Sequence, residues 1–107
     1  MQLLVKWNVV EGTDPTAVIN LLPKEEFFAW NAYLSGTLRQ FWLTQNPGEV
    51  IMIQEFDSLE HAVKANQNLP LMKAGMLKAT WFELKPFQSW EFLFASEFKT
   101  NSKNVMQ

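Results

Sequence analysis

Residues 37–56 read TLRQFWLTQNPGEVIMIQEF, and this stretch decides the fold. Two apolar segments, Thr37–Thr44 and Glu49–Phe56, flank the polar sequence Gln45-Asn46-Pro47-Gly48. Proline at the second position of a turn and glycine at the third fit type II geometry. We therefore predict a β-hairpin at the centre of the chain.

Two further segments, Gln2–Val10 and Leu77–Lys85, alternate in the way that is typical of strands. Helices are predicted at about Thr16–Ser35 and at Leu59–Gln67. The order strand, helix, strand, strand, helix, strand specifies a ferredoxin-like βαββαβ fold of the α+β class. In this fold a four-stranded antiparallel sheet carries its helices on one face.

The first predicted helix has recognisable ends and an internal proline. Asp14 and Pro15 fit the N-cap and the first helical position, and Gly36 fits the residue that follows the last turn. Pro23 predicts a break or kink, because proline removes a hydrogen bond and clashes with the preceding turn. The main helix would then begin at Pro23 and turn three apolar residues toward the sheet, namely Phe27, Trp30 and Leu34.

The second predicted helix begins after Asp57, whose spacing to Glu60 in the first turn fits a capping box. It ends before Pro70, and a connector at Leu71–Gly75 leads to the last strand.

The sheet is predicted to have one bare apolar face. Strict alternation in Thr37–Thr44 would separate Phe41 from Trp42, and would place Phe41 with residues such as Ile51 and Phe82. Helices on one face leave either this set or the opposite set uncovered, and both are apolar. Aromatic residues make up 14% of the chain, more than one small core easily hides. We therefore expect two sheets to pack face to face, as in a dimeric α/β barrel.

Length and composition narrow the classes of function. With 107 residues and a net charge of −2, the chain fits one domain without the basic patch of a nucleic-acid-binding protein. It contains no cysteine, and no apolar run approaches the ~20 residues of a membrane span. A single histidine, His61, gives no metal site. We expect a cytoplasmic protein with no metal, no nucleic-acid partner and no membrane contact.

The domain is expected to cover residues 1–87, and residues 88–107 form a C-terminal extension. Ser89 could cap a short helix that carries Trp90, Leu93, Phe94 and Phe98 on one side. Such an aromatic segment is expected to dock on its own domain or on a neighbour, whereas the polar residues 100–107 are expected to fray.

Two motifs resemble those of muconolactone isomerases. The segment Leu38-Arg39-Gln40-Phe41-Trp42, after Ser35-Gly36, is similar to their Arg-x-Leu-Trp stretch, and Asn68-Leu69-Pro70-Leu71-Met72 to their Leu-Pro-Leu-Phe connector. The resemblance covers about residues 1–87. It implies a small protein without a cofactor that assembles into dimers or a ring of dimers. It also implies an isomerase that moves a proton on an unsaturated lactone carboxylate.

Proton transfer beside a carbonyl requires a base and a group that stabilises the enolate. We predict Glu26 as the base, with Arg39 and Lys24 binding a substrate anion. The alternative for Glu26 is a solvated carboxylate at a helix start, and the alternative for Arg39 is a salt bridge at the sheet edge.

The remaining candidates would line the pocket. Trp42 and Trp81 are predicted as its aromatic wall, which Trp7 would join if the three lie on one side, unless they serve packing at the barrel interface. Gln54 lies among apolar residues and needs a polar partner, so a place in the pocket and a structural hydrogen bond are both open. His61 lies in the first turn of a helix, where an exposed histidine is ordinary, and its role is left open.

The sequence thus predicts an isomerase-like enzyme that acts by proton transfer on a small cyclic or aromatic acid. A non-catalytic domain for small-molecule binding or assembly is the first alternative. A cofactor-independent monooxygenase of the same barrel class, acting on an aromatic polyketide, is the second.

Overall fold

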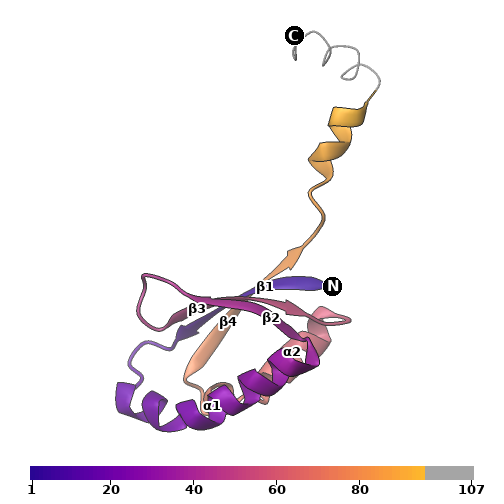
Figure 1. Cartoon of the computed structure of the whole chain (residues 1–107). Helices are drawn as coiled ribbons and strands as arrows, with labels where there is room; N and C mark the ends of the chain where they lie inside the picture. Colours follow the sequence, from indigo (N-terminus) through magenta and orange to yellow (C-terminus); the bar gives the residue numbers. More distant parts are fainter. Residues whose placement is uncertain (96–107) are drawn as a thin grey trace.

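The computed structural model describes residues 1–95 (Figure 1). The order of elements confirms the predicted ferredoxin-like arrangement, with a short extra helix, α3, in the expected connector. The elements are β1 (Gln2–Val9), α1 (Pro15–Ser35), β2 (Leu38–Leu43), β3 (Glu49–Glu55), α2 (Leu59–Gln67), α3 (Pro70–Lys73), β4 (Leu77–Leu84) and the 3₁₀ helix η1 (Gln88–Phe94). None of the helices in residues 1–95 is long and apolar enough to cross a membrane.

The four strands form one antiparallel sheet in the order β2-β3-β1-β4. Val5 of β1 lies between Met52 of β3 and Trp81 of β4, so these three side chains share a face. Figure 1 shows that α1 and α2 cover this face and leave the other uncovered. The core lies beneath the helices, where Leu3, Val5 and Met52 are fully buried.

Turns and caps follow local chemistry in most places. Asp14 Oδ1 accepts a hydrogen bond from Thr16 N over 3.0 Å, and Gly36 ends α1 with a φ of 86°. In the hairpin turn the amide of Glu49 donates to the carbonyl of Asn46 over 3.3 Å, and Gly48 has a φ of 74°. These geometries confirm the predicted N-cap, helix end and type II turn.

The predicted capping box of α2 is wrong. The cap is Ser58, whose Oγ accepts a hydrogen bond from His61 N over 3.1 Å. Ser58 has an extended backbone that directs its short hydroxyl at the first turn. Glu60 instead forms an ion pair with Lys64 one turn later, over 3.4 Å.

The predicted break at Pro23 is also wrong, because α1 continues through this residue. A proline inside a helix removes one backbone donor, and packing along the rest of a long helix can outweigh that loss. The face that α1 turns to the sheet differs from the prediction as well. Phe27, Trp30 and Leu34 are 64%, 58% and 64% exposed.

Small residues, rather than those large ones, form the face of α1 that packs on the sheet. Ala29 and Ala32 pack against the core, and Glu25 is the buried residue of α1. These three positions are spaced by four and three residues, which is the spacing of one helical face. The sequence pattern of large apolar residues therefore marked the wrong face of the helix.

A β-bulge in β2 changes the assignment of side chains to faces. Leu38 of β2 pairs with Gln54 of β3, and Gln40 pairs with Ile53, which is adjacent to Gln54. Arg39, between Leu38 and Gln40, therefore has no partner in β3 and is the inserted residue of the bulge. Beyond the bulge, Phe41 lies opposite Met52 and therefore on the helix-covered face. The prediction from strict alternation was wrong here, because it had no signal for an inserted residue.

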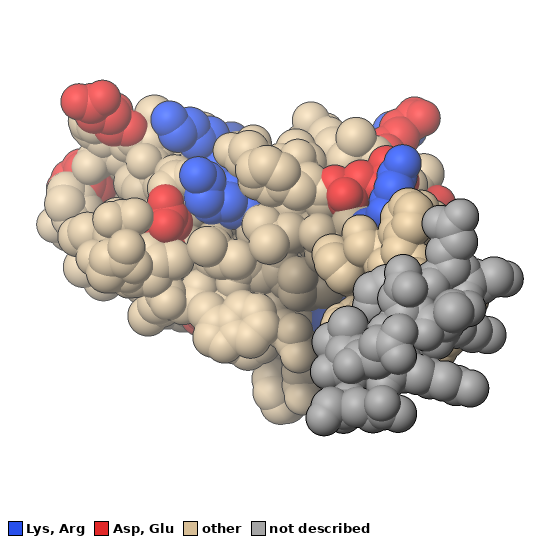
Figure 2. All heavy atoms as spheres, turned by 90° about the horizontal axis from the view of Figure 1, so that it is seen from above, with Lys and Arg blue, Asp and Glu red and all other residues tan. Residues whose placement is uncertain are grey.

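The bare face consequently carries Trp42 instead of Phe41. By register it also carries Leu4, Ile51, Ile53, Phe82 and Leu84. Figure 2 looks down on this side of the molecule, where uncharged residues cover most of the visible surface and the charged side chains gather along one margin.

The chain after β4 leaves the domain. Figure 1 shows η1 standing clear of the sheet, on the side away from α1 and α2. The predicted docking of this segment on its own domain is therefore not seen, and Phe87 rather than Ser89 precedes its first turn, without a side-chain cap. Phe98, the fourth residue of the predicted aromatic side, lies outside the described residues.

Candidate functional site

A cavity of about 590 Å³ opens between α1 and the β2–β3 half of the sheet. A volume of this size suits a small organic ligand. Its lining is mostly apolar and aromatic, with few polar side chains, and consists of Trp7, Glu25, Glu26, Ala29, Trp30, Tyr33, Leu38, Phe41, Trp42, Leu43, Val50 and Met52.

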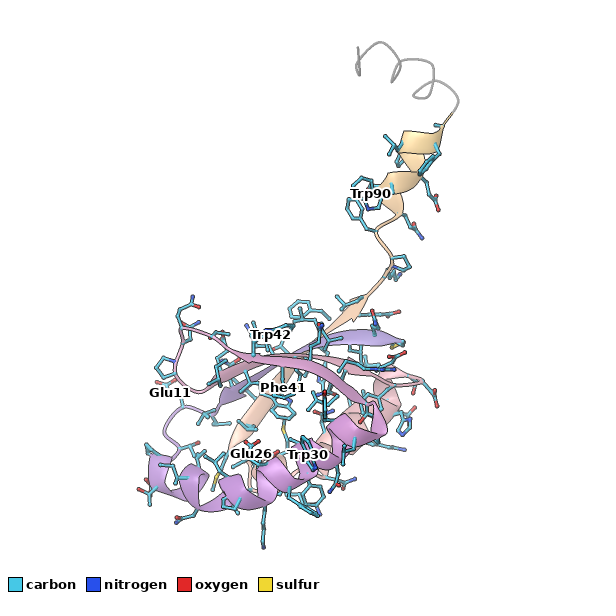
Figure 3. The ribbon with its side chains drawn as sticks, viewed as in Figure 1. Glu11, Glu26, Trp30, Phe41, Trp42 and Trp90 are labelled. Atoms are coloured by element: carbon cyan, nitrogen blue, oxygen red, sulfur yellow. The ribbon has the colours of Figure 1, made fainter. Side chains whose placement is uncertain are left out.

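Three aromatic rings form a wall that joins α1 to β2. Trp30 stacks on Tyr33 with ring centroids 5.8 Å apart, and Tyr33 meets the edge of Phe41 at 6.2 Å. Trp30 and Tyr33 are three residues apart on the helix, so their side chains lie one above the other. Figure 3 shows Phe41 on the α1 side of β2 and Trp42 on the opposite side. We call Trp30, Tyr33 and Phe41 the aromatic wall.

Glu25 is the buried carboxylate of the cavity and is only 3% exposed. Its Oε1 accepts a hydrogen bond from the backbone amide of Leu71 over 3.0 Å, which ties α1 to α3. Its Oε2 is buried and has no hydrogen-bond partner among residues 1–95. Burial raises the pKa of Glu25 above its ordinary value; the Leu71 amide opposes this rise, and the nearby Glu26 charge adds to it.

Trp7 supplies the second unsatisfied polar atom of the cavity. Its Nε1–H is buried and lacks an acceptor among the described residues. Buried polar groups nearly always have a partner, and an unpaired one costs about 1–3 kcal/mol. Among the residues that line the cavity, Glu25 and Trp7 thus each have one buried polar atom without a hydrogen-bond partner, an acceptor and a donor respectively.

Comparison with known proteins begins from solved structures, since no family model and no curated protein matches the chain in sequence. Muconolactone isomerase superimposes with a TM-score of 0.66 at 21% identity, covering 81% of this chain and 93% of that one. The chain has the fold of muconolactone isomerase.

A second solved structure matches equally well. The 5-chloro-2-hydroxyhydroquinone dehydrochlorinase of Burkholderia phenoliruptrix AC1100, solved with 2,5-dihydroxybenzoquinone, has a TM-score of 0.66 at 16% identity. The match covers 79% of this chain and 94% of the dehydrochlorinase. The two matches establish the muconolactone isomerase-like fold shared by dimeric α/β barrel proteins.

Two of the predicted site residues lie in this cavity of the muconolactone isomerase-like fold. Glu26 lines it from α1 and is exposed, and Trp42 borders it from the edge strand β2, although its side chain lies on the bare side of the sheet. Neither has the buried, unpaired polar atom that distinguishes Glu25 and Trp7.

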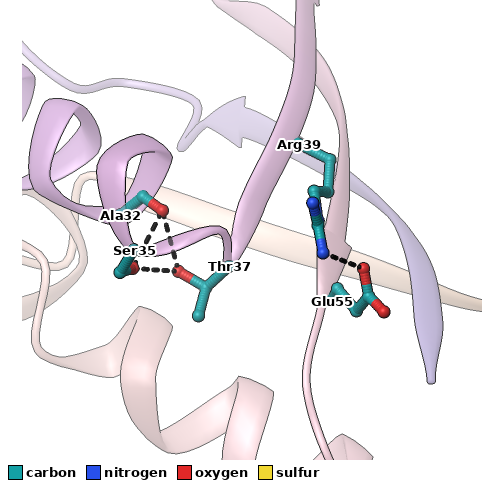
Figure 4. A network of polar contacts seen from close by, with 5 residues as sticks. All are labelled: Ala32, Ser35, Thr37, Arg39 and Glu55. Carbon is teal, nitrogen blue, oxygen red and sulfur yellow. Dashed lines mark hydrogen bonds and ion pairs between the residues drawn. The ribbon is translucent and has the colours of Figure 1, made fainter.

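Three predicted residues lie elsewhere. Arg39, the bulge residue, forms an ion pair with Glu55 over 2.8 Å (Figure 4), which is the salt bridge that the sequence left open. Lys24 is exposed on α1 and is not part of the cavity lining. Trp81 packs against the core from β4, outside this lining.

Gln54 has a structural partner. It exchanges hydrogen bonds with Asn66 of α2, and both residues line a second cavity of about 290 Å³. His61 is exposed and also borders this second cavity. Among residues 1–95, no three histidine, aspartate or glutamate side chains gather in a way that could hold a metal ion.

The end of α1 is held by a local polar network that fixes the start of β2. The hydroxyls of Ser35 and Thr37 both donate to the carbonyl of Ala32, over 3.0 and 3.2 Å (Figure 4). This network sets where the bulge and the following aromatic residue begin, and so helps to place Phe41 beside Tyr33.

Two residues of the candidate site, Glu25 and Tyr33, were missed by the sequence analysis, and Trp7 was considered only as part of an aromatic pocket. Glu25 lies four residues before Ala29 and seven before Ala32, so the small residues marked the buried face. Trp7 shares its strand face with Leu3 and Val5, which marked it as buried without indicating an unpaired N–H.

Proposed function

We propose that this protein is a cofactor-free enzyme that moves a proton on a small oxygenated ring compound, with Glu25 as the acid–base group. The observation that carries the proposal is the unpaired Oε2 of Glu25 in a cavity whose lining also holds the unpaired N–H of Trp7.

The electrostatics of Glu25 suit this role. A general base works best when its pKa approaches the working pH, and burial shifts the pKa of Glu25 in that direction. The hydrogen bond from Leu71 occupies Oε1 and fixes the carboxyl group, which leaves Oε2 for the substrate. Glu26 would act by its charge, which favours the protonated form of its neighbour.

The reaction balances without a further reagent. Ionised Glu25 removes a proton from a carbon next to a carbonyl, and the electron pair of that bond forms an enolate. The N–H of Trp7 donates to the enolate oxygen as negative charge develops there. Protonated Glu25 then returns the proton to the conjugated carbon, so the double bond has moved and the enzyme is unchanged.

The charge of the cavity narrows the substrate class. Two glutamates line it, and the residues of its lining within 1–95 include no lysine or arginine. A carboxylate substrate would meet repulsion there, so we favour a neutral, planar lactone or quinone-like ring that packs on the aromatic wall. The names of the similar proteins, which concern muconolactone and a dihydroxybenzoquinone complex, agree with oxygenated rings.

The test is proton exchange measured by NMR in D₂O. We expect the wild-type chain to exchange the acidic C–H protons of a neutral β,γ-unsaturated five-membered lactone and to convert it into its conjugated isomer. Glu25→Gln should lower the rate ~100-fold or more, because the base is lost while the amide oxygen still accepts from Leu71. Glu26→Gln is the matched control and should retain most of the rate. Equal rates in the wild type and Glu25→Gln would refute the assignment.

A non-catalytic binding domain is the second candidate. It is favoured by the hydrogen bond between Glu25 and Leu71, which also gives this carboxylate a structural role. In that case the same lactones and hydroxyquinones would quench tryptophan fluorescence without proton exchange.

We also propose that two copies pair through their bare sheet faces. The face carries exposed Trp42 and Phe82 beside Ile51 and Ile53. Exposed apolar patches of this kind mark interaction sites, and two sheets pack ~10 Å apart when their side chains interdigitate.

A further inference from the structure

The segment Lys85–Phe94, which we call the arm, carries a dense set of exposed apolar rings. Phe87 and Trp90 meet edge to face with centroids 5.7 Å apart. Four large side chains of the arm are between 63% and 75% exposed, namely Phe87, Trp90, Phe92 and Phe94. Figure 3 shows Trp90 far from the sheet. Such side chains stabilise a structure only when another surface covers them and removes them from water.

The direction of the arm restricts what can cover it. The chain after β4 leads out on the bare side of the sheet, away from α1 and α2 (Figure 1). The arm is therefore directed toward whatever packs on the bare face. If a second copy packs there, the arm extends along the body of that copy rather than back over its own.

The length of the arm matches this path. Three extended residues and the seven residues of η1 span about 24 Å, at ~3.3 Å and ~2.0 Å per residue. A facing sheet lies ~10 Å away, and the helix layer behind it is another ~10 Å across. The arm thus reaches the helix layer of the second copy, where the mouth of the α1–β2 cavity lies.

The mouth of that cavity is a suitable receptor. Its aromatic wall is about half exposed, and Phe27 adds another exposed ring on the same helix. Rings from the arm can meet these rings edge to face or offset-stacked, which contributes about 0.5–1.5 kcal/mol per pair beyond area burial. A cavity closed in this way would also exclude water from Glu25.

We propose that the arm of one copy docks over the α1–β2 cavity of a second copy and completes its outer wall with Trp90 and neighbouring rings. The proposal rests on the sheet-to-sheet pairing proposed above. It assigns a ligand-covering role to Trp90, which comes from the partner chain.

Chemical cross-linking tests this arrangement without any assay of turnover. The chain has no cysteine, so each thiol is introduced at a chosen place. Glu91→Cys labels the arm, and Leu34→Cys labels α1 one turn after Trp30, at an exposed position. Lys64→Cys on α2 is an exposed control away from the cavity lining.

Full-length Glu91→Cys and Leu34→Cys chains are mixed, allowed to exchange subunits and treated with a short bis-maleimide. We expect a dimer-sized band in this mixture, and at least five-fold less of it when Lys64→Cys replaces Leu34→Cys. A chain that carries both Glu91→Cys and Leu34→Cys should lose its cross-links when it exchanges subunits with excess cysteine-free wild type, because its partner then has no thiol.

Three results would overturn the proposal: a cross-link within one chain of the double variant that survives dilution, equal yields with the α2 control, or no cross-link between chains. Failure of the proton-exchange assay would leave this result unaffected, so the two proposals can fail separately.

Discussion

The side chains of Gln54 and Asn66 exchange two hydrogen bonds across the interface between β3 and α2. Gln54 Nε2 donates to Asn66 Oδ1 over 3.1 Å, and Asn66 Nδ2 donates to Gln54 Oε1 over 2.8 Å. Asn66 Nδ2 also donates to the carbonyl of Ala62 over 2.7 Å. Both amides are 4% exposed, so this pair fixes the position of α2 on the sheet where water cannot replace either partner.

Replacing Asn66 by alanine is expected to lower the free energy of unfolding by about 1–3 kcal/mol, because it leaves the amide of Gln54 buried without its partner. Urea denaturation followed by circular dichroism measures the change. Gln67→Ala, at the exposed neighbouring position, should shift stability by less than ~0.5 kcal/mol. Similar losses in the two variants would show that the pair contributes nothing specific.

Stability should depend on pH through Glu25. Burial raises its folded-state pKa, so the unfolded chain loses this proton first as pH rises from the ordinary value of 4.5. The contribution of protonated Glu25 to the free energy of unfolding is complete below pH 4.5 and is lost as pH rises through the raised folded-state pKa. The stability of the wild type should therefore fall relative to Glu25→Gln across that window. Denaturation midpoints of the two proteins at several pH values measure it, and a constant difference contradicts it.

Glu49 should titrate in the opposite sense. Hydrogen bonds from Asn8, Thr44 and Asn46 lower the pKa of its carboxyl group. The stabilisation they provide is present above the ordinary value of 4.5 and is lost as pH falls through the lowered folded-state pKa. The carboxyl carbon shift of Glu49, followed by NMR, should have a higher midpoint in Asn8→Ala than in the wild type.

Asn68→Ala is the control for this titration, because Asn68 lies at the end of α2 and has no hydrogen bond to Glu49. A midpoint of Glu49 that stays unchanged in Asn8→Ala would show that the Asn8 amide does not stabilise the ionised form.

Association through the bare sheet face should depend on Phe82. This side chain is half exposed and lies opposite Leu4 by register. Phe82→Lys places a charge in the proposed interface and should convert a dimer into a monomer at micromolar concentration, as measured by light scattering. Phe28→Lys, on the exposed side of α1, should leave the mass unchanged. A monomeric wild type would refute both the sheet-to-sheet pairing and the docking of the arm.

The sequence was a reliable guide at several places where local chemistry determines geometry, although the capping box of α2 and the break at Pro23 were wrong. The type II turn at Pro47 and Gly48, the cap at Asp14 and the strand order all agree with the structure. The turn and the cap depend on residues that are close in the chain, and the alternating apolar pattern permits few arrangements of the strands.

The site was harder to predict, because its geometry depends on rotation and register. Glu25 and Glu26 are adjacent, yet a 100° turn of the helix separates a buried carboxylate from an exposed one. Only the position of Ala29 and Ala32 against the sheet decides between them. Likewise, one inserted residue at Arg39 exchanges the faces of Phe41 and Trp42, and the strand pattern contains no sign of it.

Ala29 of α1 limits the volume of the cavity and therefore the size of the ligand that fits in it. A helix that presented leucine at position 29 would fill space that the cavity now leaves open. Replacing Ala29 by valine or leucine is therefore expected to reduce the size of the ligand that fits, without changing Glu25 or Trp7. A small library at this one position would sort candidate ligands by volume while leaving the proposed acid–base residues unchanged.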